Sequence, residues 1–159
     1  METYVFDTDV IINLNKFNPR VFKSLWNNLY NMIDNKIIFS VPEVQREISE
    51  IDDSVKEKWN EIHNNNGFFV DLSEKDNSLE YWRAMEELES FEIFQKHGEN
   101  KKYWADPYLI AVGIVDGSIV VTNETYKSHP QRKIPFVCEQ MNVECFNFDE
   151  FMIHQGWKW

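Results

Sequence analysis

Basic residues are scarce in this chain. Its 159 residues include 16 Lys and Arg against 27 Asp and Glu, which gives a formal net charge of −11. A protein of this charge repels polyanions over most of its surface, so the composition excludes a protein that coats DNA with a broad basic face. An anionic substrate would need a local basic patch or a bound metal ion to approach it.

Cysteines and long apolar runs are also few. The two cysteines, Cys138 and Cys145, cannot staple a secreted domain and lack C-x-x-C spacing, so we interpret them as buried thiols. No run reaches the roughly 18 apolar residues of a membrane span, and the first ten residues carry no basic region typical of a signal peptide. We therefore expect a soluble, cytoplasmic protein that does not enter a membrane.

The apolar content is nevertheless sufficient for a substantial core. Hydrophobic residues make up 43% of the chain and aromatic residues 15%, which excludes disorder as a description of the whole. The length is that of one typical domain. We expect a single domain that spans residues 1–159.

Short β-prone runs alternate with stretches of helical periodicity. The β-prone runs are residues 4–6, 37–41, 68–70, 118–122 and 143–148. Helical spacing of apolar residues marks residues 10–14, 19–33, 42–51, 55–62, 79–94, 108–115 and 151–154. Strands separated by helices are typical of a parallel sheet that is covered on both faces. The pattern therefore predicts an α/β fold.

Several carboxylates lie near the ends of the predicted strands, where an α/β fold binds its ligands. Asp7 and Asp9 come directly after the first strand, and Glu124 follows the strand over residues 118–122. Asp106 begins the helix that leads into that later strand, and Glu47 lies on the helix after the second strand. Since ligands of parallel sheets bind at the carboxyl ends of the strands, these acids are expected to converge there.

Converging carboxylates repel one another, so they need protons or a cation between them. Hard oxygen ligands suit Mg²⁺ or Mn²⁺, the ions that act on phosphate esters. Each acid also has an ordinary interpretation: Asp106 as a helix cap, Glu47 as a solvated helix residue, Asp7 and Asp9 as turn formers, and Glu124 as a surface acid. The metal hypothesis depends on all of them together.

Four short motifs, taken in order, resemble those of PIN domains. They are Asp7-Thr8-Asp9, Glu47 within residues 44–48, Asp106 within residues 105–111, and Val121-Thr122-Asn123-Glu124. With Ile134-Pro135-Phe136-Val137-Cys138 near the end, the chain looks most like a bacterial PIN subfamily catalogued as a domain of unknown function. The resemblance covers nearly the whole chain and implies a PIN-like three-layer sandwich, with a central parallel sheet flanked by helices.

The resemblance also implies an activity and partners. PIN domains are metal-dependent ribonucleases, often the toxin of a type II toxin–antitoxin pair. The implied function is thus an endoribonuclease that uses Mg²⁺ or Mn²⁺, leaves a 5′-phosphate and a 3′-hydroxyl, and is held inactive by an antitoxin protein. A homodimer is compatible with this assignment.

Individual roles carry over by position. Asp7, Asp106 and Glu124 are the implied metal ligands, and Glu47 completes the catalytic cluster through bound waters. Thr122 and Asp9 are implied to support the cluster by hydrogen bonding. The family more often has Asp where this chain has Glu124, so the longer side chain is expected to set that ligand back or to reach the metal through water.

A basic stretch follows the last motif. Lys127, Arg132 and Lys133 are candidates for contact with an RNA backbone, and a solvated loop is the alternative.

Two other functions compete with the ribonuclease. Phe6-Asp7-Thr8-Asp9-Val10 also resembles the opening motif of haloacid-dehalogenase-type phosphatases, with Asp7 as nucleophile and Asp9 as acid. That family requires a later acidic pair that this chain lacks, and it gives Glu47 and Asp106 no role. The second alternative is a PIN-like module that binds RNA or protein without cleaving it.

Overall fold

The computed structural model describes residues 1–74, 78–91, 94, 105–125 and 134–158. Along the chain its elements are β1 (Tyr4–Phe6), α1 (Thr8–Leu14), α2 (Lys23–Asp34), β2 (Ile38–Phe39), α3 (Pro42–Ile51), α4 (Asp53–Asn66), a 3₁₀ turn (Leu72–Glu74), α5 (Ser78–Leu88), α7 (Asp106–Asp116), β3 (Ile119–Val121), α8 (Ile134–Gln140), β4 (Cys145–Phe146) and α9 (Phe148–His154). Helices therefore alternate with short strands, as the sequence predicts.

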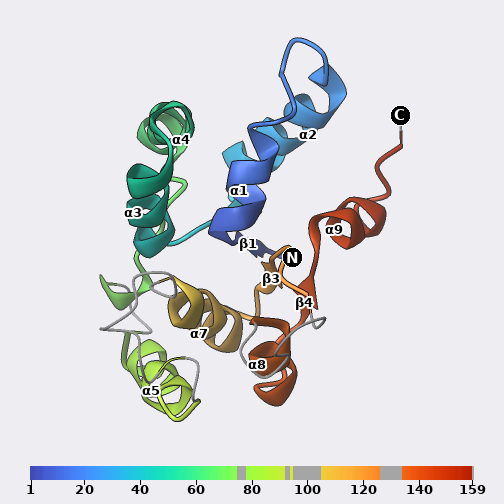
Figure 1. Cartoon of the computed structure of the whole chain (residues 1–159). Helices are drawn as coiled ribbons and strands as arrows, with labels where there is room; N and C mark the ends of the chain where they lie inside the picture. The colour runs from blue at the N-terminus through green and yellow to red at the C-terminus, as the bar shows by residue number, and fades with distance from the viewer. Residues whose placement is uncertain (75–77, 92–93, 95–104, 126–133, 159) are drawn as a thin grey trace.

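The four strands form one parallel sheet in the order β2-β1-β3-β4. Helices α1, α2 and α9 lie on one side of it, and α7 and α8 lie on the other, with α5 packed outside α7 (Figure 1). This arrangement confirms the predicted α/β fold and is consistent with a PIN-like three-layer sandwich. In the sheet, β2 lies on one side of β1 and β3 lies on the other, so the strand order reverses at β1. Ligands of such sheets bind at this reversal.

The strands are continuous apolar runs in the sequence because they are buried. Every residue of β1 and β3 is buried, because helices cover both faces of the sheet. Tyr4 and Phe6 pack edge-on against Phe151 of α9, with ring centroids 4.9 Å and 5.3 Å away. The sheet is thus fixed to its covering layer by aromatic contacts.

Several predicted boundaries are wrong. Val21 and Phe22 precede α2 instead of belonging to it, and 73% and 42% of their surfaces are exposed. Residues 68–70 make only an isolated bridge, Ser40 with Phe69, and β4 is limited to two residues. Helix α9 begins three residues earlier than predicted, because Asn147 and Glu150 form a capping box.

The helix predicted over residues 79–94 is described as α5, Ser78–Leu88, and turns a different face inward. Leu79 and Trp82, which the periodicity placed on the apolar stripe, are 62% and 51% exposed. The buried side chains are Tyr81, Ala84, Met85 and Leu88. No helix in the described part of the chain is long and apolar enough to cross a bilayer.

Candidate metal centre

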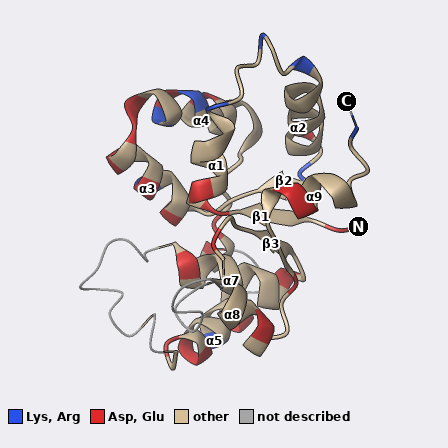
Figure 2. Ribbon diagram, turned by 45° about the vertical axis from the view of Figure 1, so that its right-hand side comes forward, with Lys and Arg blue, Asp and Glu red and all other residues tan. Residues whose placement is uncertain are grey.

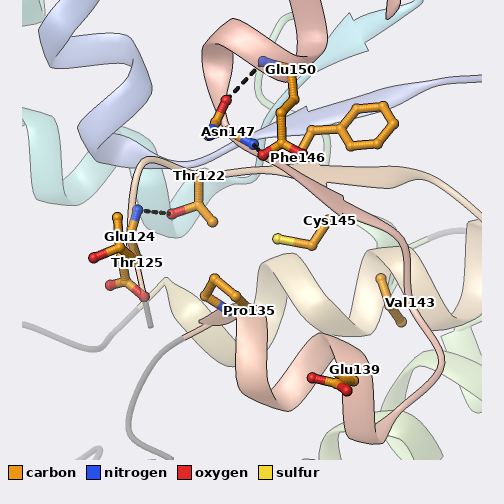
Figure 3. Close-up of a pocket in the computed structure, with 10 residues that line it drawn as sticks. All are labelled: Thr122, Glu124, Thr125, Pro135, Glu139, Val143, Cys145, Phe146, Asn147 and Glu150. Carbon is orange, nitrogen blue, oxygen red and sulfur yellow. Dashed lines mark hydrogen bonds between the residues drawn. The ribbon is translucent and has the colours of Figure 1, made fainter. Parts of the chain in front are cut away.

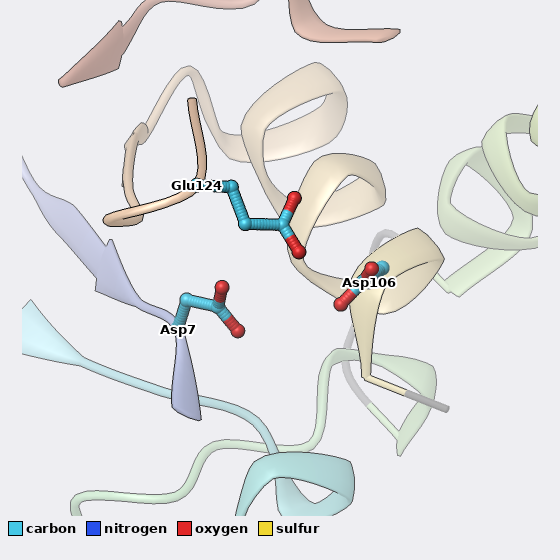
Figure 4. Close-up of side chains that lie close together, drawn as sticks. All are labelled: Asp7, Asp106 and Glu124. Carbon is cyan, nitrogen blue, oxygen red and sulfur yellow. The ribbon is translucent and has the colours of Figure 1, made fainter. Parts of the chain in front are cut away.

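Three carboxylates from distant parts of the sequence meet at the carboxyl end of the sheet. Asp7 follows β1, Glu124 lies in the segment after β3, and Asp106 is the first residue of α7. Each offers one oxygen, and these oxygens all lie within 4.8 Å of one another. Figure 4 shows the three side chains pointing toward a common space. The predicted convergence is therefore present for these three acids, whereas Glu47 and Asp9 lie outside the group.

Asp7 is one of two buried members of this acidic cluster, which we define as Asp7, Asp106 and Glu124. Only 4% of its surface is exposed. The Thr122 hydroxyl donates a hydrogen bond to Oδ2 at 2.8 Å, and the Thr8 amide donates to Oδ1 at 2.7 Å. The second bond makes Asp7 the cap of α1, so the start of this helix and the end of β3 fix the carboxylate from two sides.

Burial and repulsion both oppose the charge of Asp7. Its pKa lies well above the ordinary value, first because burial removes water and then because Asp9, Asp106 and Glu124 repel its charge. Burial likewise raises the pKa values of Asp9 and Glu47. A divalent cation would relieve this repulsion.

Asp106 does not cap its helix. The sequence allowed this residue to be an ordinary N-cap, but the cap position is Ala105, and Asp106 lies inside the first turn with 4% of its surface exposed. A buried carboxylate near two others is costly unless the site uses its charge. The capping interpretation is therefore wrong.

Glu47 lies beside the cluster, and its carboxylate serves a different purpose. Its Oε1 accepts a hydrogen bond from the Ala105 amide at 3.0 Å, and its Oε2 accepts one from the Thr8 hydroxyl. Ala105 directly precedes Asp106, and Thr8 directly follows Asp7. Glu47 thus connects α3 to the residues next to two members of the cluster.

Glu124 reaches the cluster in spite of its length. The Ile134 amide, at the start of α8, donates to Glu124 Oε2 at 2.8 Å, and the Glu124 amide donates to Thr122 Oγ1 at 3.2 Å. The segment Ile134–Cys138 therefore contributes to the site through its backbone. The longer side chain of Glu124 need not set it back from the metal, because one of its oxygens lies within 4.8 Å of ligand oxygens of Asp7 and Asp106.

Asp9 lies outside the acidic cluster and bonds to the segment that follows β3. Both of its oxygens accept from the Asn123 amide, at 3.2 and 3.3 Å. The Asn123 side-chain oxygen in turn accepts from the Phe148 amide at 3.2 Å. These bonds join the ends of β1 and β3 to the start of α9, which agrees with a supporting role for Asp9.

A pocket adjoins the cluster on the β4 side (Figure 3). Its volume is about 450 Å³, and Thr122 and Glu124 are among its lining residues, together with Pro135, Glu139 and Cys145. This volume is within the range of ligand pockets.

The remaining sequence predictions have different outcomes. Cys138 is buried and Cys145 half-buried, and neither forms a disulfide. A hydrogen bond with Cys145, together with burial, raises the pKa of the Cys138 thiol well above its usual range, so this thiol is not a ready nucleophile. Lys127, Arg132 and Lys133 lie outside the described residues, and their contact with RNA stays a prediction.

Residues 4–159 match the model of a family described as a domain of unknown function, DUF4411. The chain belongs to this family. No curated protein and no solved structure matches the chain. The DUF4411 description names no activity, so the function of the chain has to be argued from the cluster and its surroundings.

The donor set of this DUF4411 chain fits a hard divalent cation. Three carboxylate oxygens within 4.8 Å of one another match the ligands that Mg²⁺ and Mn²⁺ prefer. Two of the three residues are buried, and the buried Asp7 resists ionisation in the absence of a cation. We therefore treat Asp7, Asp106 and Glu124 as the residues that would hold the ion.

A metal site of this kind predicts stabilisation by Mn²⁺. An ion that binds only the folded state at 100 times its Kd adds about 2.7 kcal/mol, or about 5–10 °C in Tm for a chain of this size. Asp7→Asn and Asp106→Asn should each abolish the shift in thermal unfolding. Asp116→Asn, at the opposite end of α7, should keep it. An unchanged wild-type melting curve up to millimolar Mn²⁺ would contradict the site.

Stability in chelator should depend on pH through Asp7. The folded-state pKa of Asp7 is raised above its ordinary value of 3.8, so the folded protein binds a proton that the unfolded chain releases, and stability falls as pH rises through the folded-state pKa. Each unit of that elevation is worth about 1.4 kcal/mol. We expect Tm in chelator to rise as the pH is lowered from neutral toward the ordinary pKa of 3.8, and Asp7→Asn to flatten the rise. A wild-type profile that is as flat as that of the variant would exclude this cause.

Proposed function

We propose that this chain is a Mg²⁺- or Mn²⁺-dependent endoribonuclease of the PIN type, and that it acts as the toxin of a type II toxin–antitoxin pair. The observation that carries the proposal is the convergence of Asp7, Asp106 and Glu124 at the strand-order reversal of a parallel sheet. The order of the motifs along the chain, which resembles that of PIN domains, supports the choice of RNA as substrate.

The surrounding groups are suited to hold such a centre rigid. A divalent cation at this cluster supplies Lewis acidity toward a phosphate and lowers the pKa of a coordinated water. The chain keeps the carboxylates in place: Thr122 and the Thr8 amide hold Asp7, and the Ile134 amide holds Glu124. Groups that orient metal ligands in this way tune the geometry and charge of the centre.

Glu47 has a positioning role in this proposal. Its bonds to Thr8 and to the Ala105 amide keep the start of α7 close to the end of β1, and so hold Asp106 near Asp7. Its carboxylate also adds negative charge next to the cluster, which would favour a cation there.

The phosphatase alternative is less well supported. In that hypothesis Asp9 would act as the acid, yet both of its oxygens accept a hydrogen bond from the Asn123 amide. Asp106 and Glu47 would have no role, although one is buried in the cluster and the other is bonded beside it. The ribonuclease hypothesis uses all four acids.

The acidic cluster would also be a suitable binding site for an antitoxin. A group of carboxylates attracts a cationic side chain, and an inserted Arg or Lys would replace the charge of the metal while it excludes RNA. Binding of such a partner should weaken at high salt and when Asp7 or Asp106 is neutralised.

Expression in a bacterial host tests the toxin proposal. We expect the wild-type chain to arrest growth, Asp7→Asn to permit growth, and Asp116→Asn to arrest growth as the wild type does. Co-expression of the protein encoded next to it should relieve the arrest. Normal growth with high levels of wild-type protein that cleaves RNA after purification would identify a solitary RNA-processing enzyme. Normal growth with no metal-dependent cleavage would favour a binding module without catalysis.

A further inference from the structure

Acidic residues are absent from one stretch of this acidic chain. Residues 10–33 contain no Asp or Glu, but they include Lys16, Arg20 and Lys23. All three basic side chains are exposed, and they lie in the loop between α1 and α2 and at the first residue of α2. Figure 2 shows blue segments in this loop and at the start of α2, and several red segments on α3.

Apolar side chains are exposed at the same place. Val21 and Phe22 are 73% and 42% exposed, and Phe22 rests edge-on against Phe17 with a centroid distance of 5.1 Å. We name Lys16, Arg20, Val21, Phe22 and Lys23 the basic tip. Cations interleaved with an exposed aromatic ring are typical of surfaces that bind single-stranded nucleic acid.

The loop has a fixed conformation. The Trp26 indole donates a hydrogen bond to the Phe17 carbonyl at 2.6 Å, and the Arg20 amide donates to Asn18 Oδ1 at 2.9 Å. The Phe22 amide donates to the Asn18 carbonyl at 2.9 Å. A surface held in place in this way loses little conformational entropy when a ligand binds.

A further cation lies beneath the loop. Lys58 Nζ of α4 is 3.4 Å from the centroid of the Trp26 ring, and Trp26 is the residue whose indole holds Phe17. The indole that holds the loop is therefore itself in contact with α4.

The basic tip and the acidic cluster are connected by one short helix. Asp7 caps α1, which has seven residues and is therefore about 10 Å long. Only Asn15 separates the end of this helix from Lys16, the first residue of the tip. A single strand with one phosphate at the cluster can therefore reach the start of the tip within a few nucleotides.

We propose that the basic tip binds the single-stranded RNA substrate at a distance from the cleaved bond: Lys16, Arg20 and Lys23 contact its phosphates, and a base stacks on Phe22. This inference rests on the proposed ribonuclease function and names how the substrate is held. The tip provides the local positive charge that an anionic substrate needs on a protein of net charge −11.

The test compares two variants of equal charge. The tip variant carries Lys16→Gln, Arg20→Gln and Lys23→Gln, and the control carries Lys36→Gln, Arg83→Gln and Lys158→Gln, which change exposed residues outside the tip. Fluorescence anisotropy with a labelled single-stranded RNA is measured in chelator, so that the RNA stays intact, over a range of salt concentrations. Thermal unfolding confirms that both variants fold.

We expect the tip variant to bind the RNA at least about 10-fold more weakly at low salt, with the slope of log K against log salt reduced by about 2, because each single-strand phosphate contact contributes about 0.7. The control should bind like the wild type. In Mn²⁺, cleavage of the RNA should fall with the tip variant, while hydrolysis of bis-p-nitrophenyl phosphate, which is too small to reach the tip, should not change.

Equal RNA affinity of the tip variant and the wild type would overturn the inference, and metal-dependent cleavage by both would leave the ribonuclease function intact. Tip-dependent RNA binding without any cleavage would support the inference and contradict the nuclease. If the wild type binds no RNA, the inference is wrong. If the wild type forms a dimer that only the tip variant loses, the tip is a protein contact and the inference is also wrong.

Discussion

Asp7→Asn is expected to lower RNA cleavage in Mg²⁺ or Mn²⁺ by at least about 100-fold, since loss of residues that merely support a metal ligand already costs about 10–100-fold. The substitution removes the charge that a cation needs but keeps an acceptor for the Thr8 amide. It also keeps a polar partner for the Thr122 hydroxyl. The fold should therefore remain intact while the centre loses one of its two buried ligands.

The measurement is the rate of cleavage of a mixed RNA panel by repeatedly purified protein. Asp116→Asn is the matched control, because it makes the same change at the end of α7 away from Asp106, about 15 Å along the helix. Thr122→Val should lie between the two, since it removes the donor to Asp7 without removing a ligand. Cleavage by Asp7→Asn at the wild-type rate would mean that the nuclease assignment is wrong or that the activity is a contaminant.

The acids of the site could be predicted from the sequence because each follows or precedes a recognisable element. Asp7 ends an apolar strand, and Asp106 stands before Pro107 and a helix that is apolar almost all round. Parallel strands then require their carboxyl ends to meet at one edge. The place of the cluster follows from these facts without any knowledge of the side-chain contacts.

The groups that hold the acids could not be predicted in the same way. Glu47 and Glu124 accept hydrogen bonds from the amides of Ala105 and Ile134, and a backbone N–H is present at every residue except proline. Nothing in the side chains of an alanine or an isoleucine indicates this role. Thr8 is a partial exception, because a hydroxyl between two acids is a visible signal.

The predicted boundaries of helices and strands are wrong where capping or tertiary packing determines them. The apolar spacing of Val21 and Phe22 fits the stripe of α2, yet the helix begins at Lys23. Periodicity alone cannot tell an apolar residue at a helix end from one in the loop before it. Leu79 and Trp82 show a different limit, because both lie inside α5 and only the face that is buried was predicted wrongly.

Gly113 is a structural feature that the sequence did not reveal. It lies inside α7, where glycine normally weakens a helix by about 1 kcal/mol relative to alanine. A Cβ added there would lie 2.5 Å from Val143 Cγ1 and 3.2 Å from the Ser118 carbonyl oxygen. The helix can thus approach β3 this closely only because position 113 has no side chain.

This close approach also concerns the acidic cluster. Gly113 is seven residues after Asp106, which is about two helical turns, so both lie on the same face of α7. A side chain at position 113 would push that face away from β3, and β3 leads directly to Thr122 and Glu124. The packing of α7 and the distance of Asp106 from its fellow ligands are therefore coupled.

Gly113→Ala is expected to destabilise the protein by about 1–3 kcal/mol, the usual cost of forcing a methyl group into a packed core, although the same change in an exposed helix would stabilise it. Urea unfolding measures the difference. Val143→Ala removes the atom in the closest contact, so the double variant should lose less stability than the sum of the two single variants. The Mn²⁺ response of Gly113→Ala should be weaker than that of the wild type, because Asp106 moves with α7. If Gly113→Ala is more stable than the wild type, the helix does not need this close contact with the sheet.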